Sequence, residues 1–575
     1  MRLMLKYMSP YRLRITITIF LKFAAVIFEL LIPYILETMI DVAAPAEDVE
    51  RICVYGVIMV FCAVAAFWLN ITANRMATKT ARDAIRAVRG DLFSKTMYLC
   101  GDDFDDVTLP SLISRMTSDS YNVQNFLGMI QRMGVRAPII LAGGIAVACS
   151  MDMGLTLILV CMVPVLLSVI IFISKKGIPL FRRVQGKVDH VVRVMRENIS
   201  GIRVIKALSM TEYEKERFGR ANDMLTDEDI HAGEIMALPN PVMNLFLNLG
   251  LTCVILVGAY RVDAGVMKTG VILAFLTYFN IIIMAVMGVN RIFISYSKAG
   301  ASADRIQEVL ECGDSFGQKE NEISGAVEPE KGHDSDYMIE FEDVSIDKMG
   351  LKGVSFKVRR GGTLGIIGAT GCGKTTVLNL MMRFYDVDAG RVLIDGTDVR
   401  NMGLKDLRSR FGVVFQNDMI FNDTLYENIS FGRNLAVSEV RRAADDAGIA
   451  GFIEGLEEKY NYMAAIKGMN LSGGQRQRIL IARALAGDPD IIVLDDASSA
   501  LDYRTDAGIR ARLLAEYKGV VKIVIAQRVS SVMNMDNIIV MDEGKIIGSG
   551  THEALLAECE LYRGLFKLQM GEVQG

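Results

Sequence analysis

Six segments in the first half of the chain are apolar and long enough to cross a lipid bilayer, and they limit the fold of that half more than any other feature. They lie at about 15–38, 53–76, 132–150, 154–175, 242–262 and 270–293. A lipid core offers no hydrogen-bond partner to backbone amides, so such segments cross it as helices of about 20 residues. We therefore predict a domain of six transmembrane helices. At 575 residues, with 51% hydrophobic residues and a mean hydropathy of +0.31, the chain has room for a soluble domain as well.

The charges of the loops predict how these helices are oriented. Basic residues cluster before the first span and after the second and fourth, at Arg2, Lys6, Arg12, Arg14, Arg75, Lys79, Arg82, Arg86, Arg89, Lys175, Lys176, Arg182 and Arg183. The connection at 41–50 is acidic. Because basic loops remain in the cytoplasm, both termini are expected there. The polar stretches 77–130 and 176–241 keep helical periodicity, which predicts helical extensions on the cytoplasmic side.

Composition excludes some classes of function. A net charge of -4 gives no basic surface for nucleic acid. The nine cysteines and four histidines show neither disulfide nor metal-ligand spacing. Residues 313–337 are hydrophilic and rich in Gly, Glu, Ser and Lys, which is typical of a linker. We expect a membrane domain at 1–312 and a soluble domain at 338–575.

A complete phosphate-binding loop lies near the start of the soluble domain. It follows an apolar strand at 363–367, precedes a helix at 375–384, and matches the pattern G-x-x-x-x-G-K-[ST]. Its residues are Gly368, Ala369, Thr370, Gly371, Cys372, Gly373, Lys374, Thr375 and Thr376. The glycines let backbone N–H groups surround phosphates, Lys374 reaches the terminal phosphates, and Thr375 offers its hydroxyl to Mg²⁺. The order of strand, loop and helix disfavours a chance match.

A second polar position supports a metal at the same place. Asp495 ends the apolar strand at 491–494, which puts a carboxylate beside the phosphate loop. A carboxylate there is suited to holding Mg²⁺ through water. We therefore assign Thr375 and Asp495 to the metal.

Residues Leu471-Ser472-Gly473-Gly474-Gln475 stand just before an apolar helix pattern at 479–485. With the phosphate loop, they resemble the nucleotide-binding domain of ATP-binding-cassette (ABC) transporters. Residues 111–119 and 197–207 are similar to stretches of the exporter-type membrane domain of that family. The resemblance implies a six-helix all-α transmembrane domain followed by an α/β P-loop domain that takes ATP and Mg²⁺. It also implies that the helical extensions end in short coupling helices that touch the nucleotide-binding domains.

The resemblance assigns roles to further residues. Gln416 matches the glutamine loop, which contacts Mg²⁺ or the attacking water, and 498–502 match the D-loop, which crosses to the partner domain. The signature residues act on ATP held by the other subunit, and they are Ser472, Gly473, Gly474 and Gln475.

Two departures from the family pattern concern catalysis. Asp496 stands where the catalytic glutamate is expected, and its stem is one methylene shorter. Gln527 occupies the position where the family has the switch histidine. Its amide can bind phosphate but cannot carry a proton. A positioned base contributes about 10² to 10⁴ in rate, so losing its reach raises the barrier by roughly 3 to 5 kcal/mol. We expect this site to bind ATP and to hydrolyse it slowly.

Two further departures concern base recognition and coupling. Residues 344–348 (VSIDK) lack the aromatic residue that stacks on adenine, and 465–468 (AIKG) lack a glutamate that contacts the coupling helices. Base selectivity and coupling are therefore expected to differ from the family pattern.

A weakened ATP site on this chain, together with an intact signature, implies that the partner subunit is a different chain. The resemblance to heterodimeric bacterial exporters thus implies a half-transporter in the plasma membrane, paired with a chain that keeps the catalytic glutamate and switch histidine. Its substrate would be a drug, lipid or other amphipathic molecule. Two alternatives stay open: a regulatory or ATP-gated subunit that does not pump, and a homodimeric exporter in which Asp496 works as the base.

Glu29 lies well inside the first span, where a charge costs about 2.5 to 3.5 kcal/mol. It should therefore face a cavity or a partner. A structural ion pair and a contact with substrate are both open. The 33 methionines, Met284 among them, fit a pliable pocket or, more simply, apolar filler of the spans.

Overall fold

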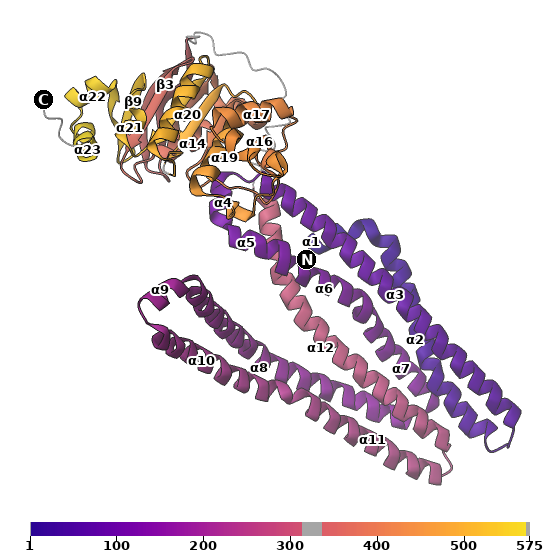
Figure 1. Cartoon of the computed structure of the whole chain (residues 1–575). Coiled ribbons are helices and arrows are strands. Elements are labelled where there is room, and N and C mark those ends of the chain that lie inside the picture. Colours follow the sequence, from indigo (N-terminus) through magenta and orange to yellow (C-terminus); the bar gives the residue numbers. More distant parts are fainter. Residues whose placement is uncertain (1, 313–335, 499, 571–575) are drawn as a thin grey trace. The chain divides into compact units, whose positions relative to one another are not determined.

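The computed structural model describes residues 2–312, 336–498 and 500–570 (Figure 1). The chain divides into two compact units. Met1–Met97 and Val107–Cys312 form the first, and Tyr98–Asp106 and Gly313–Gly575 form the second. Most of the expected linker, at 313–335, lies outside the described residues.

The described part of the first unit is helical. Its elements, with α4 at the border of the second unit, are α1 (Arg2–Met8), η1 (Ser9–Tyr11), α2 (Arg12–Thr38), η2 (Met39–Ala43), α3 (Val49–Met97), α4 (Gly101–Val107), α5 (Leu109–Ser114), η3 (Arg115–Asp119), α6 (Ser120–Met129), η4 (Ile130–Gly134), α7 (Val135–Met151), α8 (Met153–Ser200), α9 (Ile202–Ala207), α10 (Thr211–Ala237), α11 (Pro239–Asp263) and α12 (Thr269–Glu311).

The apolar segments predicted from the sequence are helices in the structure. Among the described residues, five helical runs are long and apolar enough to cross a membrane, and a shorter apolar run covers Met153–Leu166 at the start of α8. The third predicted segment continues a helix that begins before it, because α6, η4 and α7 follow one another without a break. The prediction of a helical membrane domain is confirmed, and α4 and α9 are short helices within the two polar stretches.

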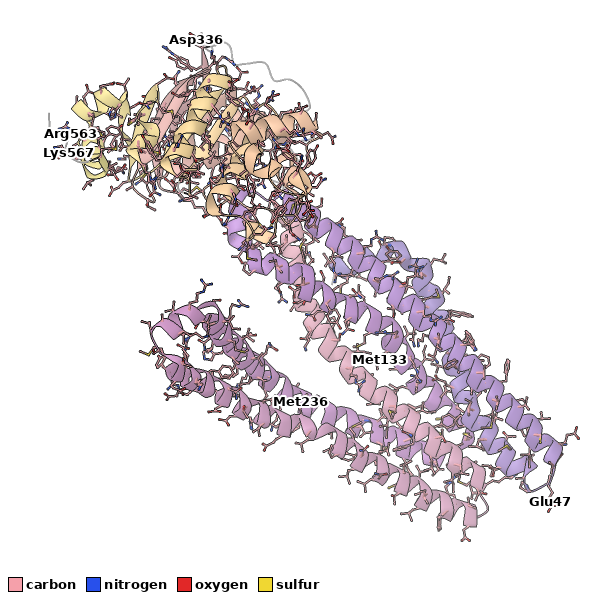
Figure 2. The ribbon with its side chains drawn as sticks, in the orientation of Figure 1. Glu47, Met133, Met236, Asp336, Arg563 and Lys567 are labelled. Carbon is pink, nitrogen blue, oxygen red and sulfur yellow. The ribbon has the colours of Figure 1, made fainter. Side chains whose placement is uncertain are left out.

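Packing in the first unit follows the long helices (Figure 1). α2 lies along α3, α8 lies along α10 and α11, and α12 contacts α2, α6 and α7 as well as α8 and α11. Glu47 marks the tip where α2 and α3 are joined (Figure 2). At another connection, buried Asp152 caps α8 by accepting from the Leu155 N–H at 2.8 Å, and it pairs with Arg261 of α11 at 2.8 Å. Capping and ion pairing thus use the same carboxylate.

The second unit contains two sheets and the helices around them. Its strands are β1 (Tyr337–Ile346), β2 (Leu351–Arg359), β3 (Thr363–Gly368), β4 (Ala389–Ile394), β5 (Thr397–Asp398), β6 (Phe411–Val414), β7 (Ile491–Asp495), β8 (Val521–Ala526), β9 (Asn537–Asp542) and β10 (Lys545–Gly550). Its other helices are α14 (Lys374–Met381), η5 (Val399–Asn401), α15 (Leu404–Ser409), α16 (Leu425–Ser430), α17 (Val437–Asp446), α18 (Ala450–Glu454), η6 (Lys459–Asn461), η7 (Ile466–Gly468), α19 (Gly473–Leu485), α20 (Tyr503–Glu516), α21 (Val529–Val532), α22 (His552–Glu558) and α23 (Glu560–Met570).

The larger sheet determines where polar residues meet. Its strand order is β10-β9-β3-β8-β7-β6, and β3 pairs in parallel with both β8 and β9. Every residue of β3, β7 and β8 is buried, as expected for parallel strands covered on both faces. Because the carboxyl ends of parallel strands share one edge, the segments that follow β3, β6, β7 and β8 meet there.

Residues 98–106 pack against the sheet-containing part of their own unit. The Gly101 N–H donates to the Phe384 carbonyl at 3.0 Å, and Tyr385 Oη donates to Asp105 at 3.3 Å. A Cβ at position 101 would lie 2.4 Å from the Tyr385 ring and 2.8 Å from the Phe384 carbonyl oxygen. Only glycine therefore fits this contact.

We predict that Gly101→Ala loosens residues 98–106. The added methyl group meets a backbone carbonyl, which cannot turn away as a side chain can. Hydrogen–deuterium exchange of the peptide covering 98–107 should become at least about tenfold faster. Gly90→Ala in α3 is the control, since a Cβ there meets nothing within 4 Å. Unchanged exchange in Gly101→Ala would contradict the contact.

Candidate nucleotide-binding site

The phosphate loop has the backbone shape that its glycines permit. Gly373 adopts φ +101° and caps α14, a conformation that residues with a side chain rarely take. At Gly368, a Cβ would lie 2.2 Å from the Met541 carbonyl oxygen of β9. The loop is therefore fixed against the sheet at its start and turns left-handed at its end.

Lys374 lies inside the curve of this loop. Its ammonium group donates to the carbonyl oxygens of Gly368 at 2.9 Å and Ala369 at 2.7 Å. These bonds hold the positive charge beside the loop and the N-terminus of α14, where an anion is favoured.

Two carboxylates stand at the end of β7, where Asp495 is the last residue of the strand and Asp496 follows it. Asp495 is 3% exposed and accepts a hydrogen bond from the Thr375 hydroxyl at 3.1 Å. Asp496 has a left-handed backbone, with φ +50°, and its N–H donates to the Ile525 carbonyl at 2.9 Å. The backbone of Asp496 is thus fixed by the neighbouring strand β8.

These groups line one pocket of about 170 Å³. Ten residues selected from the sequence lie in its wall: Thr370, Gly371, Gly373, Lys374, Thr375, Thr376, Gln416, Asp495, Asp496 and Gln527. Gly368, Ala369 and Cys372 are not in the wall. The first two contribute the carbonyls that bind Lys374, and the side chain of Cys372 is buried.

The signature residues are not part of this pocket. Ser472 caps α19: its Oγ accepts from the Gln475 N–H at 3.2 Å, and Gln475 Oε1 accepts from the Ser472 N–H at 2.8 Å. Gly473 and Gly474 approach Ala500. Ser499 of the expected D-loop lies outside the described residues. Among the described residues of this single chain, the phosphate loop and the signature therefore form separate sites.

Sequence reasoning missed Met349, which lies in the pocket wall directly after the stretch that lacks the expected aromatic residue. Its neighbour Lys348 is exposed, and its ammonium group binds Asp102 at 2.8 Å and Asp105 at 3.2 Å. Hydrogen bonding to Asp102 raises the pKa of the Lys348 ammonium. The same turn thus places the apolar side chain of Met349 in the pocket wall and the ammonium group of Lys348 against residues 98–106. The one signal for Met349 in the sequence is that an apolar residue follows the stretch without an aromatic residue.

The stretch that lacks the expected glutamate forms η7. Ile466 there is 56% exposed, so an apolar surface takes the place of a charge. The side chain of Asn470 holds this turn by accepting from the Ala465 N–H at 2.9 Å and donating to the Met463 carbonyl at 3.0 Å.

Comparisons with known proteins agree with this geometry. A family model described as "ABC transporter transmembrane region" matches residues 15–286, and one described as "ABC transporter" matches residues 351–499. The uncharacterized ABC transporter ATP-binding protein YfiB of Bacillus subtilis is 32% identical, with 99% of this chain and 98% of YfiB covered. The ATP-dependent lipid A-core flippase of Syntrophus aciditrophicus is 31% identical, with 80% of this chain and 76% of the flippase covered. A solved structure of a bacterial Atm1-family ABC exporter with ATP bound has a TM-score of 0.81 at 22% identity, covering 98% of this chain and 99% of that one.

We predict a pH dependence of Mg²⁺-assisted nucleotide binding. Burial raises the pKa of both Asp495 and Asp496, although Lys374 opposes the rise. A raised pKa means that the carboxyls take up protons at a higher pH than the usual value of about 4, and a protonated carboxyl holds Mg²⁺ poorly. The gain in affinity for a fluorescent ATP analogue on adding Mg²⁺ should therefore shrink as the pH falls, and the loss should begin above the usual carboxyl value of about 4.

Asp495→Asn is the control for this measurement, because its amide carries no titratable proton. It should show little gain from Mg²⁺ at any of these pH values. A wild-type gain that stays constant down to about pH 4 would contradict the assignment.

Proposed function

The chain belongs to the ABC transporter family, and from that premise we propose that it is one subunit of an ATP-driven exporter of amphipathic molecules in a bacterial plasma membrane, with both termini in the cytoplasm. The observation that carries the proposal is the shared edge of the larger sheet. There Lys374, Thr375 and Asp495 line one pocket.

The residues of this pocket fit ATP and Mg²⁺. Lys374 and the loop amides would bind the phosphates, and Met349 would lie against the base. Thr375, Gln416 and Asp495 would hold Mg²⁺, which supplies charge neutralisation to the phosphates when bound. The hydrogen bond from Thr375 to Asp495 already brings two of these oxygen ligands together.

Slow hydrolysis at this site is the second part of the proposal. Asp496 would act as the base, and its backbone, bound to Ile525, limits how far the short side chain can be moved toward the attacking water. Gln527 is exposed at the end of β8 and lines the pocket, where its amide can bind a phosphate oxygen but cannot share a proton with Asp496.

The signature residues support a dimer with an unlike chain. They form the N-terminus of α19 and do not line this chain's own pocket, and such a terminus favours an anion. In the dimer they would complete the partner's site, which would carry out most of the hydrolysis. ATP binding would draw the two nucleotide-binding domains together and move residues 98–106, which pack on this domain through Gly101 and Lys348.

The relatives agree with an amphipathic substrate. One is named a lipid A-core flippase, and another, YheH of Bacillus subtilis, a probable multidrug resistance transporter. A homodimeric exporter is the second candidate, and the observation that favours it is the place of Asp496 in the pocket wall.

We predict that, in the chain co-purified with its partner subunit, a substitution in the signature lowers ATP hydrolysis strongly and a substitution of Asp496 lowers it little. Gly473→Asp places a carboxylate where the partner's ATP would be bound, and its Cβ meets only Ala500 at 3.7 Å, so the fold accepts it. ATP hydrolysis by the pair should fall by about 100-fold or more. Asp496→Asn should leave more than about half of the hydrolysis, because the slow site contributes little.

Gly508→Asp in α20 is the control, since a Cβ there meets nothing within 4 Å, and it should leave hydrolysis unchanged. The same variants are then measured for ATP-dependent uptake of a fluorescent amphiphile into inside-out vesicles. Equal loss of hydrolysis in Gly473→Asp and Asp496→Asn would support the homodimer instead. Hydrolysis without uptake would contradict transport of such molecules.

A further inference from the structure

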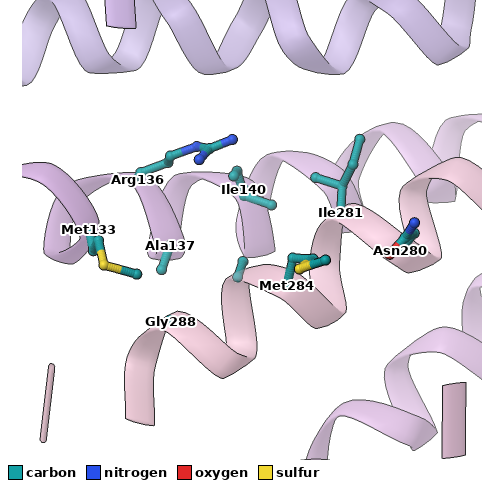
Figure 3. A pocket seen from close by; sticks show the side chains of 9 residues that line it. Met133, Arg136, Ala137, Ile140, Asn280, Ile281, Met284 and Gly288 are labelled. Atoms are coloured by element: carbon teal, nitrogen blue, oxygen red, sulfur yellow. The ribbon is translucent and has the colours of Figure 1, made fainter. Parts of the chain in front are cut away.

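A hollow of about 260 Å³ lies between α7 and α12 in the membrane unit (Figure 3). One wall comes from η4 and α7 and the other from α12. The lining residues are Met133, Arg136, Ala137, Ile140, Asn280, Ile281, Met284, Ala285 and Gly288. Most of the surface is apolar, and Arg136 is the charged residue among those that line it. A side chain at position 288 would meet Met133 Cε at 3.0 Å, so the glycine keeps this part of the hollow open.

Arg136 belongs to a chain of polar contacts that leaves excess positive charge. Its guanidinium donates to Glu29 Oε2 at 2.8 Å, and Glu29 Oε1 accepts from Asn70 at 2.8 Å. Asn70 in turn accepts from the ammonium group of Lys22 at 2.7 Å, and Lys22 is only 3% exposed. The single carboxylate of Glu29 therefore lies between two cations.

This arrangement decides between the two hypotheses for Glu29, a structural ion pair and a contact with substrate. Glu29 forms an ion pair with Arg136 of a neighbouring helix, as expected for a charge in a membrane span. It is 21% exposed at its side chain, whereas the Arg136 side chain is 45% exposed. The cation, and not the carboxylate, is thus the group of the pair that is open to a ligand.

The guanidinium has unused binding capacity. Arginine carries five N–H donors, and among the described residues Glu29 is the one hydrogen-bond partner of Arg136. The planar fork of a guanidinium matches a carboxylate or phosphate in two parallel hydrogen bonds. Across the hollow, Asn280 offers an amide, and Met284 and Ile281 offer apolar contact.

We propose that this hollow binds an amphipathic organic anion, with its carboxylate or phosphate on Arg136 and an apolar group against Met284 and Ile281. The inference rests on the proposed transport function and names the substrate class. The volume is below the roughly 300 to 1,000 Å³ of pockets that enclose a drug-sized ligand, so the hollow holds the polar end and the adjoining part of the apolar group.

The test compares a matched pair of probes, dansyl-labelled undecanoic acid and its methyl ester, with the full chain in neutral phosphatidylcholine nanodiscs without nucleotide. Arg136→Gln should weaken binding of the acid by about tenfold or more and leave the ester unchanged. Glu29→Gln should strengthen binding of the acid by about three- to tenfold, because it removes the carboxylate that competes for Arg136. The opposite signs distinguish ligand binding from loss of folding, which would weaken both probes in both variants.

Arg220→Gln, on the exposed face of α10, is the matched control and should change neither probe. Phosphatidylglycerol nanodiscs test the source of the anion: if they suppress binding of the acid in wild type, the hollow takes lipid headgroups, and if they do not, it takes the free amphiphile. Equal acid affinity in wild type, Arg136→Gln and Glu29→Gln would overturn the proposal. Because no ATP is present, that result would leave the proposed transport function untouched.

Discussion

The pairing of β3 between β8 and β9, and of β8 with β7, is the constraint on which the nucleotide site depends. This register places Ile367 beside Ala526 and Asp495 beside Ile525, so the phosphate loop, the two carboxylates and Gln527 leave the sheet at one edge. Strands β3, β7 and β8 are fully buried, and a slip of their pairing by one residue would turn their side chains to the opposite face of the sheet. The glycine at 368 belongs to the same constraint, because the Met541 carbonyl of β9 leaves no space for a side chain.

A different constraint governs the membrane unit, where charges are costly unless paired. Asp152 with Arg261, and Glu29 with Arg136, join helices that are far apart in sequence. Such pairs hold the helices in register, but they need not use every donor of the arginine. Arg136 remains 45% exposed at its side chain and lines an apolar hollow, and under our proposal it would give the helical unit a preference for anions. Under the proposed function, one unit would bind the nucleotide and the other would recognise the transported molecule.

The sequence predicted the features that depend on neighbouring residues. Apolar runs predicted the long helices, and the strand β3 and the helix α14 flank the glycine loop as predicted, because both patterns are local. The sequence does not predict contacts between residues that are far apart along the chain. Lys348 binds Asp102 and Asp105 across more than 240 positions, and the partner of Glu29 lies 107 positions away. Met349 lies directly after the stretch that lacks the expected aromatic ring, and an apolar side chain alone does not predict its place in the pocket wall.

We infer that this edge of the sheet binds ATP and Mg²⁺ beside a base, Asp496, that is too short to reach the attacking water. In the pair with its partner subunit, Gly473→Asp silences the partner-side site, so the remaining ATP turnover reports this chain's own site. Adding Asp496→Glu to that pair lengthens the base by one methylene, and we predict that turnover then rises by about 10² or more. Equal turnover of the pair with and without Asp496→Glu would show that the length of the base does not limit hydrolysis.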